Sequence, residues 1–189
     1  MRNFFSKEAE HCYSPEHSYP QLQKACNSCK DIFDRLTKVD NTVTIKMIID
    51  DGTNFITIAR NQMGVDTRGT GQKHAINRNT AFSHLVAGNR WFLKNDLQFD
   101  SNYINTNSNW KNEYSSTLVV PIRMNEVLVG CLAVDSFKKE NVMTASNQKG
   151  QINEIYNDKN HVQLLAIFAD LIYCVISKTI EFSQEIDES

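Results

Sequence analysis

Two pairs of short apolar segments, each pair joined by a turn sequence, constrain the fold of this chain more than any other feature. In the first pair, residues 42–49 (TVTIKMII) and 54–59 (NFITIA) flank the sequence DDG. In the second pair, residues 116–124 (STLVVPIRM) and 127–134 (VLVGCLAV) flank the sequence NE. β-Branched residues favour strands, and Asp, Asn and Gly favour the tight turns between antiparallel strands. The sequence therefore predicts two β-hairpins.

A helix is predicted before the first hairpin. Its apolar residues recur at intervals of four and three positions: Leu22, Cys26, Cys29, Phe33 and Leu36. This spacing places them on one helical face. Pro15 and Pro20 lie where a helix can begin, since proline is tolerated in the first turn, and we expect the helix to end near Lys38.

The last predicted element is a long helix over residues 158–182. One apolar face carries Leu165, Phe168, Ile172 and Val175, and a second carries Leu164, Ile167, Leu171 and Cys174. A helix that is apolar nearly all round must be buried on two sides. One side can pack on the sheet, and the other needs a partner. We therefore expect a homodimer formed through residues 162–176 and 22–36.

The middle of the chain carries turn and cap signals. Asn79 or Thr80 is a plausible N-cap for a short helix, and Gly88 a plausible stop. Residues 91–93 suggest a short strand, and the polar run 95–112 suggests loops. Pro121 lacks the N–H that a sheet needs, so its strand is expected to be bulged there or to lie at an edge.

These elements predict an α+β fold. We expect a central antiparallel sheet of five to six strands, the terminal helices on one face, and a short helix with loops over the other. The length of 189 residues, with 41% hydrophobic and 22% charged residues, suits one folded domain. We expect residues 1–15 to form a flexible arm, 16–182 the domain, and 183–189 a disordered tail.

The second hairpin and the last helix resemble a GAF domain. The strand Ser116-Thr117-Leu118-Val119-Val120-Pro121-Ile122 precedes a strand that ends Gly130-Cys131-Leu132-Ala133-Val134-Asp135-Ser136, and a helix rich in Leu and Ala follows. The resemblance covers about residues 16–182. It implies a small-molecule-sensing module with a ligand cavity under residues 74–110. Within that cover the expected ligand-binding residues are His74, Thr80, Phe82, Asp96, Phe99, Tyr103 and Trp110.

The chain departs from several ligand classes of that family. Bilin-binding members need a cysteine near the cavity, whereas Cys131 lies on a strand and Cys174 in the last helix. Asp135-Ser136 stands where cyclic-nucleotide members often carry Asn-Lys, so nucleotide binding is an open possibility without its motif. The family's free methionine sulfoxide reductases need a cysteine before the second hairpin, and none lies between Cys29 and Cys131.

Other catalytic and metal patterns are weak. The Cys26-x-x-Cys29 pair suggests a zinc site with His11, Cys12 and His17, but both cysteines lie on the apolar helical face, which favours burial. The glycine-rich run 64–73 lacks the Gly-Lys-Ser/Thr ending of a phosphate-binding loop. We expect no metal, haem or bilin. Ligand binding or dimerisation without a ligand is favoured over enzyme activity.

Charge and composition limit the partners. The net charge is −2 and no basic block occurs, which argues against nucleic acid. The N-terminus becomes charged too early for a signal peptide. Residues 162–176 fall short of the roughly 20 residues that span a bilayer, so we expect no membrane. Five cysteines without an export signal suggest reduced thiols and a cytoplasmic location.

Overall fold

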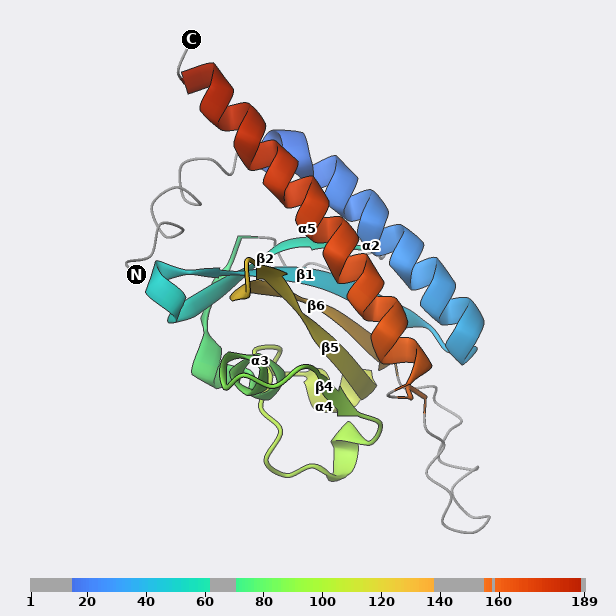
Figure 1. The fold of residues 1–189 in the computed structure, drawn as a ribbon. Coiled ribbons are helices and arrows are strands. Elements are labelled where there is room, and N and C mark those ends of the chain that lie inside the picture. The colour runs from blue at the N-terminus through green and yellow to red at the C-terminus, as the bar shows by residue number, and fades with distance from the viewer. Residues whose placement is uncertain (1–14, 62–70, 138–154, 158, 188–189) are drawn as a thin grey trace.

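A computed structural model describes residues 15–61, 71–137, 155–157 and 159–187. Its centre is a six-stranded antiparallel sheet in the order β3-β2-β1-β6-β5-β4. The strands are β1 (Asn41–Ile49), β2 (Asn54–Arg60), β3 (Lys73–Ala75), β4 (Phe92–Lys94), β5 (Tyr114–Met124) and β6 (Val127–Phe137). Helices cover both faces of this sheet (Figure 1). The predicted α+β fold is confirmed.

Both predicted hairpins are present. The turn between β5 and β6 places Asn125 and Glu126 at φ values of 47° and 68°, the pair of positive angles that a two-residue hairpin turn needs. Between β1 and β2, η1 (Asp50–Gly52) forms a short 3-10 turn. The hairpins meet through antiparallel pairing of β1 with β6 in the middle of the sheet.

Alternation along the central strands sends different side chains to the two faces. On β1, Val43 and Ile45 enter the core beneath the long helices, while Thr44 and Lys46 line a cavity on the opposite face. On β6, Leu132 likewise faces the helices. Successive side chains of a strand point to opposite faces, so one face is apolar and the other is partly polar.

The long helices α2 (Pro15–Thr37) and α5 (Asn160–Asp187) lie side by side on the apolar face (Figure 1). The core that they share with the sheet contains Leu22, Cys26, Cys29, Phe33, Leu165, Ala169, Ile172 and Ile176. Leu36, predicted on the same face, is 53% exposed and lies in the last turn of α2. Helix α5 also continues past residue 182 to Asp187, where a tail was expected.

By length and composition, residues 160–178 of α5 would suffice to cross a membrane. The expectation from the shorter stretch 162–176 understated the apolar part of this helix. One side of it packs Leu165 and Ile172 against the sheet, as a core helix does. The exposed Asp170 lies in the middle of the same segment.

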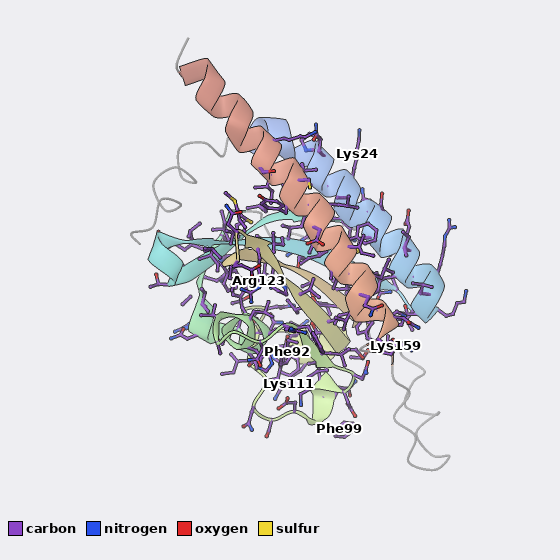
Figure 2. The ribbon with its side chains drawn as sticks, in the orientation of Figure 1. Lys24, Phe92, Phe99, Lys111, Arg123 and Lys159 are labelled. Atoms are coloured by element: carbon purple, nitrogen blue, oxygen red, sulfur yellow. The ribbon has the colours of Figure 1, made fainter. Side chains whose placement is uncertain are left out.

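The opposite face is covered by shorter elements, which are η2 (Ile76–Arg78), α3 (Thr80–Val86), η3 (Leu97–Phe99) and α4 (Trp110–Glu113). Asn79 caps α3, since its side-chain oxygen accepts a hydrogen bond from the Phe82 N–H at 2.9 Å. Gly88 adopts a φ of 94° just after the helix, as predicted for a stop. Phe92 lies inside this layer and Phe99 at its outer edge (Figure 2).

Pro121 lies within a strand that has neighbours on both sides. It pairs with Cys131 on β6, and β4 pairs only with Thr117, Leu118 and Val119 of β5. On the β4 side, β5 therefore has no strand partner beyond Val119, so Pro121 lies at a local edge. A register shift follows between Ile122 and Arg123. The expected edge or bulge is thus local, because the neighbouring strand is short.

Some predicted segments fall outside the described residues. These are residues 1–14 of the arm and residues 64–70 of the glycine-rich run 64–73. The connection 138–154 after β6 also lies outside the described residues.

Candidate functional site

A cavity of about 240 Å³ lies between the polar face of the sheet and the segment 105–108. Its walls come from five strands (β1, β2, β3, β5 and β6) and from loop residues that are distant in sequence. The lining residues are Thr44, Lys46, Thr57, Arg60, Gln72, His74, Asn105, Thr106, Asn107, Ser108, Tyr114 and Asp135. Hydroxyls, amides and charged groups make up this set.

The register of the sheet brings one cluster of these side chains together. Lys46 of β1 stands opposite Thr57 of β2, and Thr44 stands opposite Arg60. A register shift between Ile45 and Lys46 interrupts the regular pairing at this point. Bulges re-aim side chains and are frequent beside functional sites.

The Lys46 and His74 side chains both lie against the ring of Phe55 at one part of the cavity wall. The Lys46 ammonium lies 5.3 Å from the centroid of the Phe55 ring, and the His74 ring lies 5.6 Å from it. Desolvation by burial, followed by the charge of Lys46, lowers the pKa of His74. The imidazole is therefore neutral at pH 7, and Lys46 supplies the positive charge at this part of the wall.

Asp135 lies at another part of the cavity wall. Its carboxylate accepts a hydrogen bond from the Thr117 hydroxyl at 2.5 Å, and the residue is only 8% exposed. Asp135 pairs with Thr42 of β1, four positions from Lys46, which corresponds to about 13 Å along a strand. Asp135 and Lys46 are therefore well separated along the wall.

Thr44 lies between these groups and has an unusual environment. The residue is 5% exposed, and its hydroxyl oxygen has no hydrogen-bond partner among the described residues. A buried polar group normally has a hydrogen-bond partner, since leaving that bond unmade costs about 1–3 kcal/mol. A ligand in the cavity would provide that partner.

The segment 105–108 is held by its own asparagines. The Asn107 N–H donates to the Asn105 side-chain oxygen at 3.0 Å, and the Asn107 amide donates to Glu113 at 2.7 Å. The Asn105 amide donates to the Tyr103 hydroxyl at 3.1 Å. Asparagine side chains commonly stabilise loops in this way. The polar run thus forms an ordered wall of the cavity.

Of the seven residues expected to bind a ligand, His74 lines this cavity. Phe82, Tyr103 and Trp110 come together in the apolar core behind it, where the Tyr103 and Trp110 rings are 4.8 Å apart.

The remaining three lie elsewhere. The Thr80 hydroxyl accepts from the Ile104 N–H at 2.8 Å, which ties the loop to α3. Asp96 is half-buried, and desolvation raises its pKa. Phe99 is 84% exposed. A ligand-binding role for these three residues stays a prediction.

The strand residues of the cavity were missed at the sequence level. Thr44 and Lys46 sit at alternate positions of a strand whose other positions are Val43 and Ile45. This pattern of polar positions within a central strand was the available signal. Asp135 interrupts a buried strand in the same way.

The described cysteines do not line the cavity. Cys26 and Cys29 of α2 are both fully buried, as expected, and desolvation raises the pKa of Cys26 to about 12. Cys131 lies in the core on the cavity side of β6, and burial raises its pKa to about 12. These thiols are protonated at neutral pH and are poor nucleophiles. Among the described residues, no group of three or more potential metal ligands occurs.

Similar solved structures share this arrangement of sheet and helices. One is a type II free methionine-R-sulfoxide reductase from Thermoplasma acidophilum, with a TM-score of 0.61 and 18% identity over 87% of this chain and 96% of that chain. The GAF domain of an Acinetobacter phosphoenolpyruvate-protein phosphotransferase gives 0.59 and 12%, over 94% and 95%. The GAF domain of a Bacillus halodurans two-component sensor histidine kinase gives 0.57 and 15%, over 85% and 97%.

No family model matches the chain, and no curated protein matches it. The structural neighbours are predominantly GAF domains. The chain therefore has a GAF-like fold. The resemblance inferred from the second hairpin and the last helix is confirmed at the level of the fold.

Proposed function

We propose that this chain is a regulatory module that senses a small molecule in the cavity and dimerises through α2 and α5. The observation that carries the proposal is the polar cavity beside the buried hydroxyl of Thr44, which has no hydrogen-bond partner in the described part of the chain. Its volume of about 240 Å³ is below the roughly 300–1,000 Å³ of pockets for drug-sized ligands. The ligand is therefore a small metabolite.

Strand β1 contacts both the cavity and the core beneath the helices. Thr44 and Lys46 contact the cavity, while Ile45 between them packs in the core beneath α2 and α5. A ligand that shifts β1 must change the packing of that core, because protein interiors are close-packed. Binding on one face of the sheet is thereby coupled to the surface through which the module dimerises.

Thermal unfolding with a panel of small metabolites, including cyclic nucleotides, tests the sensing proposal. A compound that binds only the folded state must raise the melting temperature. We expect at least one compound to do so, and Ser108→Tyr, at an exposed position of the cavity wall, to diminish its effect. Ser101→Tyr is the matched control at an exposed position outside the wall.

A panel that leaves the melting temperature unchanged would contradict sensing and favour a scaffold without a ligand. A response that survives Ser108→Tyr would place the binding site elsewhere.

The dimer proposal rests on an apolar stripe of α5. Ile167 is 58% exposed and Leu171 is 57% exposed, and the exposed Cys174 continues the same line one turn later. The other side of the helix already packs on the sheet. A second copy of the chain is the occupant that we propose, because two such stripes are self-complementary about a two-fold axis.

Sedimentation of the wild type and of two charge variants tests the dimer. We expect a dimer at micromolar concentration and a monomer for Ile167→Glu, because a buried carboxylate at the interface is costly. Val86→Glu is the control, since Val86 is a comparably exposed apolar residue on α3, with 48% exposure. A monomeric wild type, or a wild type that binds lipid vesicles instead of itself, would contradict the proposal.

A methionine sulfoxide reductase activity is less well supported. The similarity to the Thermoplasma enzyme is one of fold. Such chemistry needs a reactive thiolate, and burial raises the pKa of Cys131 to about 12. The cavity and its polar groups support binding without requiring a nucleophile.

A further inference from the structure

The cavity wall carries charged groups of both signs. Its lining residues include two cations, Lys46 and Arg60, and one carboxylate, Asp135. His74 adds no charge at pH 7, because its pKa is lowered. Lys46 therefore gives one part of the described wall a positive charge. A group with a single negative charge complements such a wall.

Lys46 and Thr44 mark where that negative group would lie. The Lys46 ammonium contacts the face of Phe55 and forms no ion pair among the contacts found between described residues. Thr44 is next on the same face of β1, and its hydroxyl bonds to none of the residues that the structure describes. Thr57, directly opposite Lys46, adds a second hydroxyl to the wall. An ammonium flanked by hydroxyls is suited to a carboxylate, which only accepts hydrogen bonds.

Asp135 orients the rest of the ligand. It lies about 13 Å along the strands from Lys46, and it already accepts the Thr117 hydroxyl. A second negative group on the ligand would be repelled at this end of the cavity. An ammonium or hydroxyl group there would instead donate to the carboxylate.

We infer that the cavity is selective for small organic acids with one carboxylate, which lies against Lys46 and Thr44, and with a hydrogen-bond donor directed toward Asp135. This inference rests on the proposed sensing function and adds the chemical class of the ligand. We expect dicarboxylates, whose second negative charge would lie near Asp135, and amines without a carboxylate to bind more weakly.

Four compounds with the same four-carbon chain test the inference: butyrate, 4-aminobutyrate, succinate and 1-butylamine. Their effect on thermal unfolding is measured up to high millimolar concentration, with the ionic strength held constant by sodium chloride so that general screening does not vary. We expect 4-aminobutyrate to raise the melting temperature most and butyrate less. Succinate, butylamine and inorganic phosphate should have little effect.

Variants of one lysine assign the effect to the cavity. Lys46→Met should weaken the binding of 4-aminobutyrate by roughly 10- to 100-fold, the usual loss for a charge-assisted contact. Lys46→Arg should retain most of the binding. Lys73→Met is the control, because Lys73 is exposed, pairs with Asp50 and does not line the cavity. Circular dichroism of each variant without ligand establishes that it folds, and Lys46→Gln replaces Lys46→Met if the latter does not.

The outcomes separate this inference from the sensing function. Stabilisation by uncharged compounds of the larger panel, without any by the two monocarboxylates, would overturn the inference and leave sensing intact. The same holds if succinate, butylamine or phosphate binds as well as 4-aminobutyrate, or if Lys46→Met binds normally. If no compound of either panel stabilises the protein, both proposals are wrong.

Discussion

Two threonines on the cavity face of the sheet have opposite hydrogen-bonding states. The Thr117 hydroxyl donates to Asp135 at 2.5 Å, whereas the Thr44 hydroxyl has no partner among the described residues. Both residues are nearly fully buried. A buried hydroxyl stabilises the fold only when it is hydrogen-bonded. The two positions therefore form a matched pair.

We predict that Thr117→Val lowers the free energy of unfolding by about 1–3 kcal/mol, because it deprives a buried carboxylate of a donor. Thr44→Val should leave that free energy unchanged or raise it, since valine has nearly the same shape and needs no partner. Urea unfolding without ligand measures both. Equal destabilisation by the two substitutions would show that Thr44 is satisfied in the folded protein.

His161 gives a prediction for pH. Burial lowers its pKa in the folded state, and its Nδ1 atom accepts the Asn157 N–H at 3.0 Å. Below pH 6.5 the unfolded chain therefore binds the proton more readily, so this contribution to stability is present above that pH and is lost as the pH falls. His161→Asn should reduce the loss of stability between pH 7 and 5.5. An unchanged pH profile would contradict this assignment.

At the scale of elements, the contact between β1 and β6 holds the cavity wall together. Gly130 of β6 lies so close to β1 that a Cβ atom would collide with the Lys46 carbonyl oxygen and lie 2.8 Å from the Met47 sulfur. Glycine in a strand commonly permits such a close approach. We predict that Gly130→Ala destabilises the protein by roughly 1–3 kcal/mol, measured by urea unfolding. No change would mean that the strands separate easily.

Tyr156, ahead of α5, is hydrogen-bonded to Asn41 of β1 and to Asn95 just after β4. Its hydroxyl donates to the Asn41 side-chain oxygen at 2.6 Å, and its backbone N–H and C=O pair with the side chain of Asn95 at 2.8 and 2.7 Å. Tyr156→Phe should lower the melting temperature, because the buried Asn41 oxygen loses a donor. Tyr173→Phe on α5, a half-buried tyrosine, is the control. Equal effects of the two substitutions would contradict the role of this hydrogen bond.

At the scale of the whole molecule, the sequence predicted the architecture better than the site. Residues 42–59 and 116–134 carry local strand and turn signals, and Asn79 and Gly88 carry local helix signals, so their structures follow from short-range preferences. The pairing of β1 with β6 joins residues far apart in sequence. That register alone places Lys46 and Asp135 on one cavity wall, and no local pattern encodes it.

The same limitation explains why most of the expected ligand-binding residues do not line the cavity. Tyr103 and Trp110 were selected because aromatic residues in polar loops suit a binding site, but each packs into the core. In the structure they pack in the core next to the segment 105–108, while the polar side chains of the strands face the cavity. The exposed stripe of α5 follows directly from helical periodicity, and its partner stays a prediction.

The central claim is that the cavity between the sheet and residues 105–108 binds the ligand. The most direct test is to follow backbone amide signals of the ¹⁵N-labelled protein by NMR during titration with the compound that stabilises it most. We predict that the largest shifts fall on Thr44, Lys46, Thr57, Asp135 and residues 105–108. Shifts confined to α2 and α5, with the cavity residues unchanged, would contradict the claim.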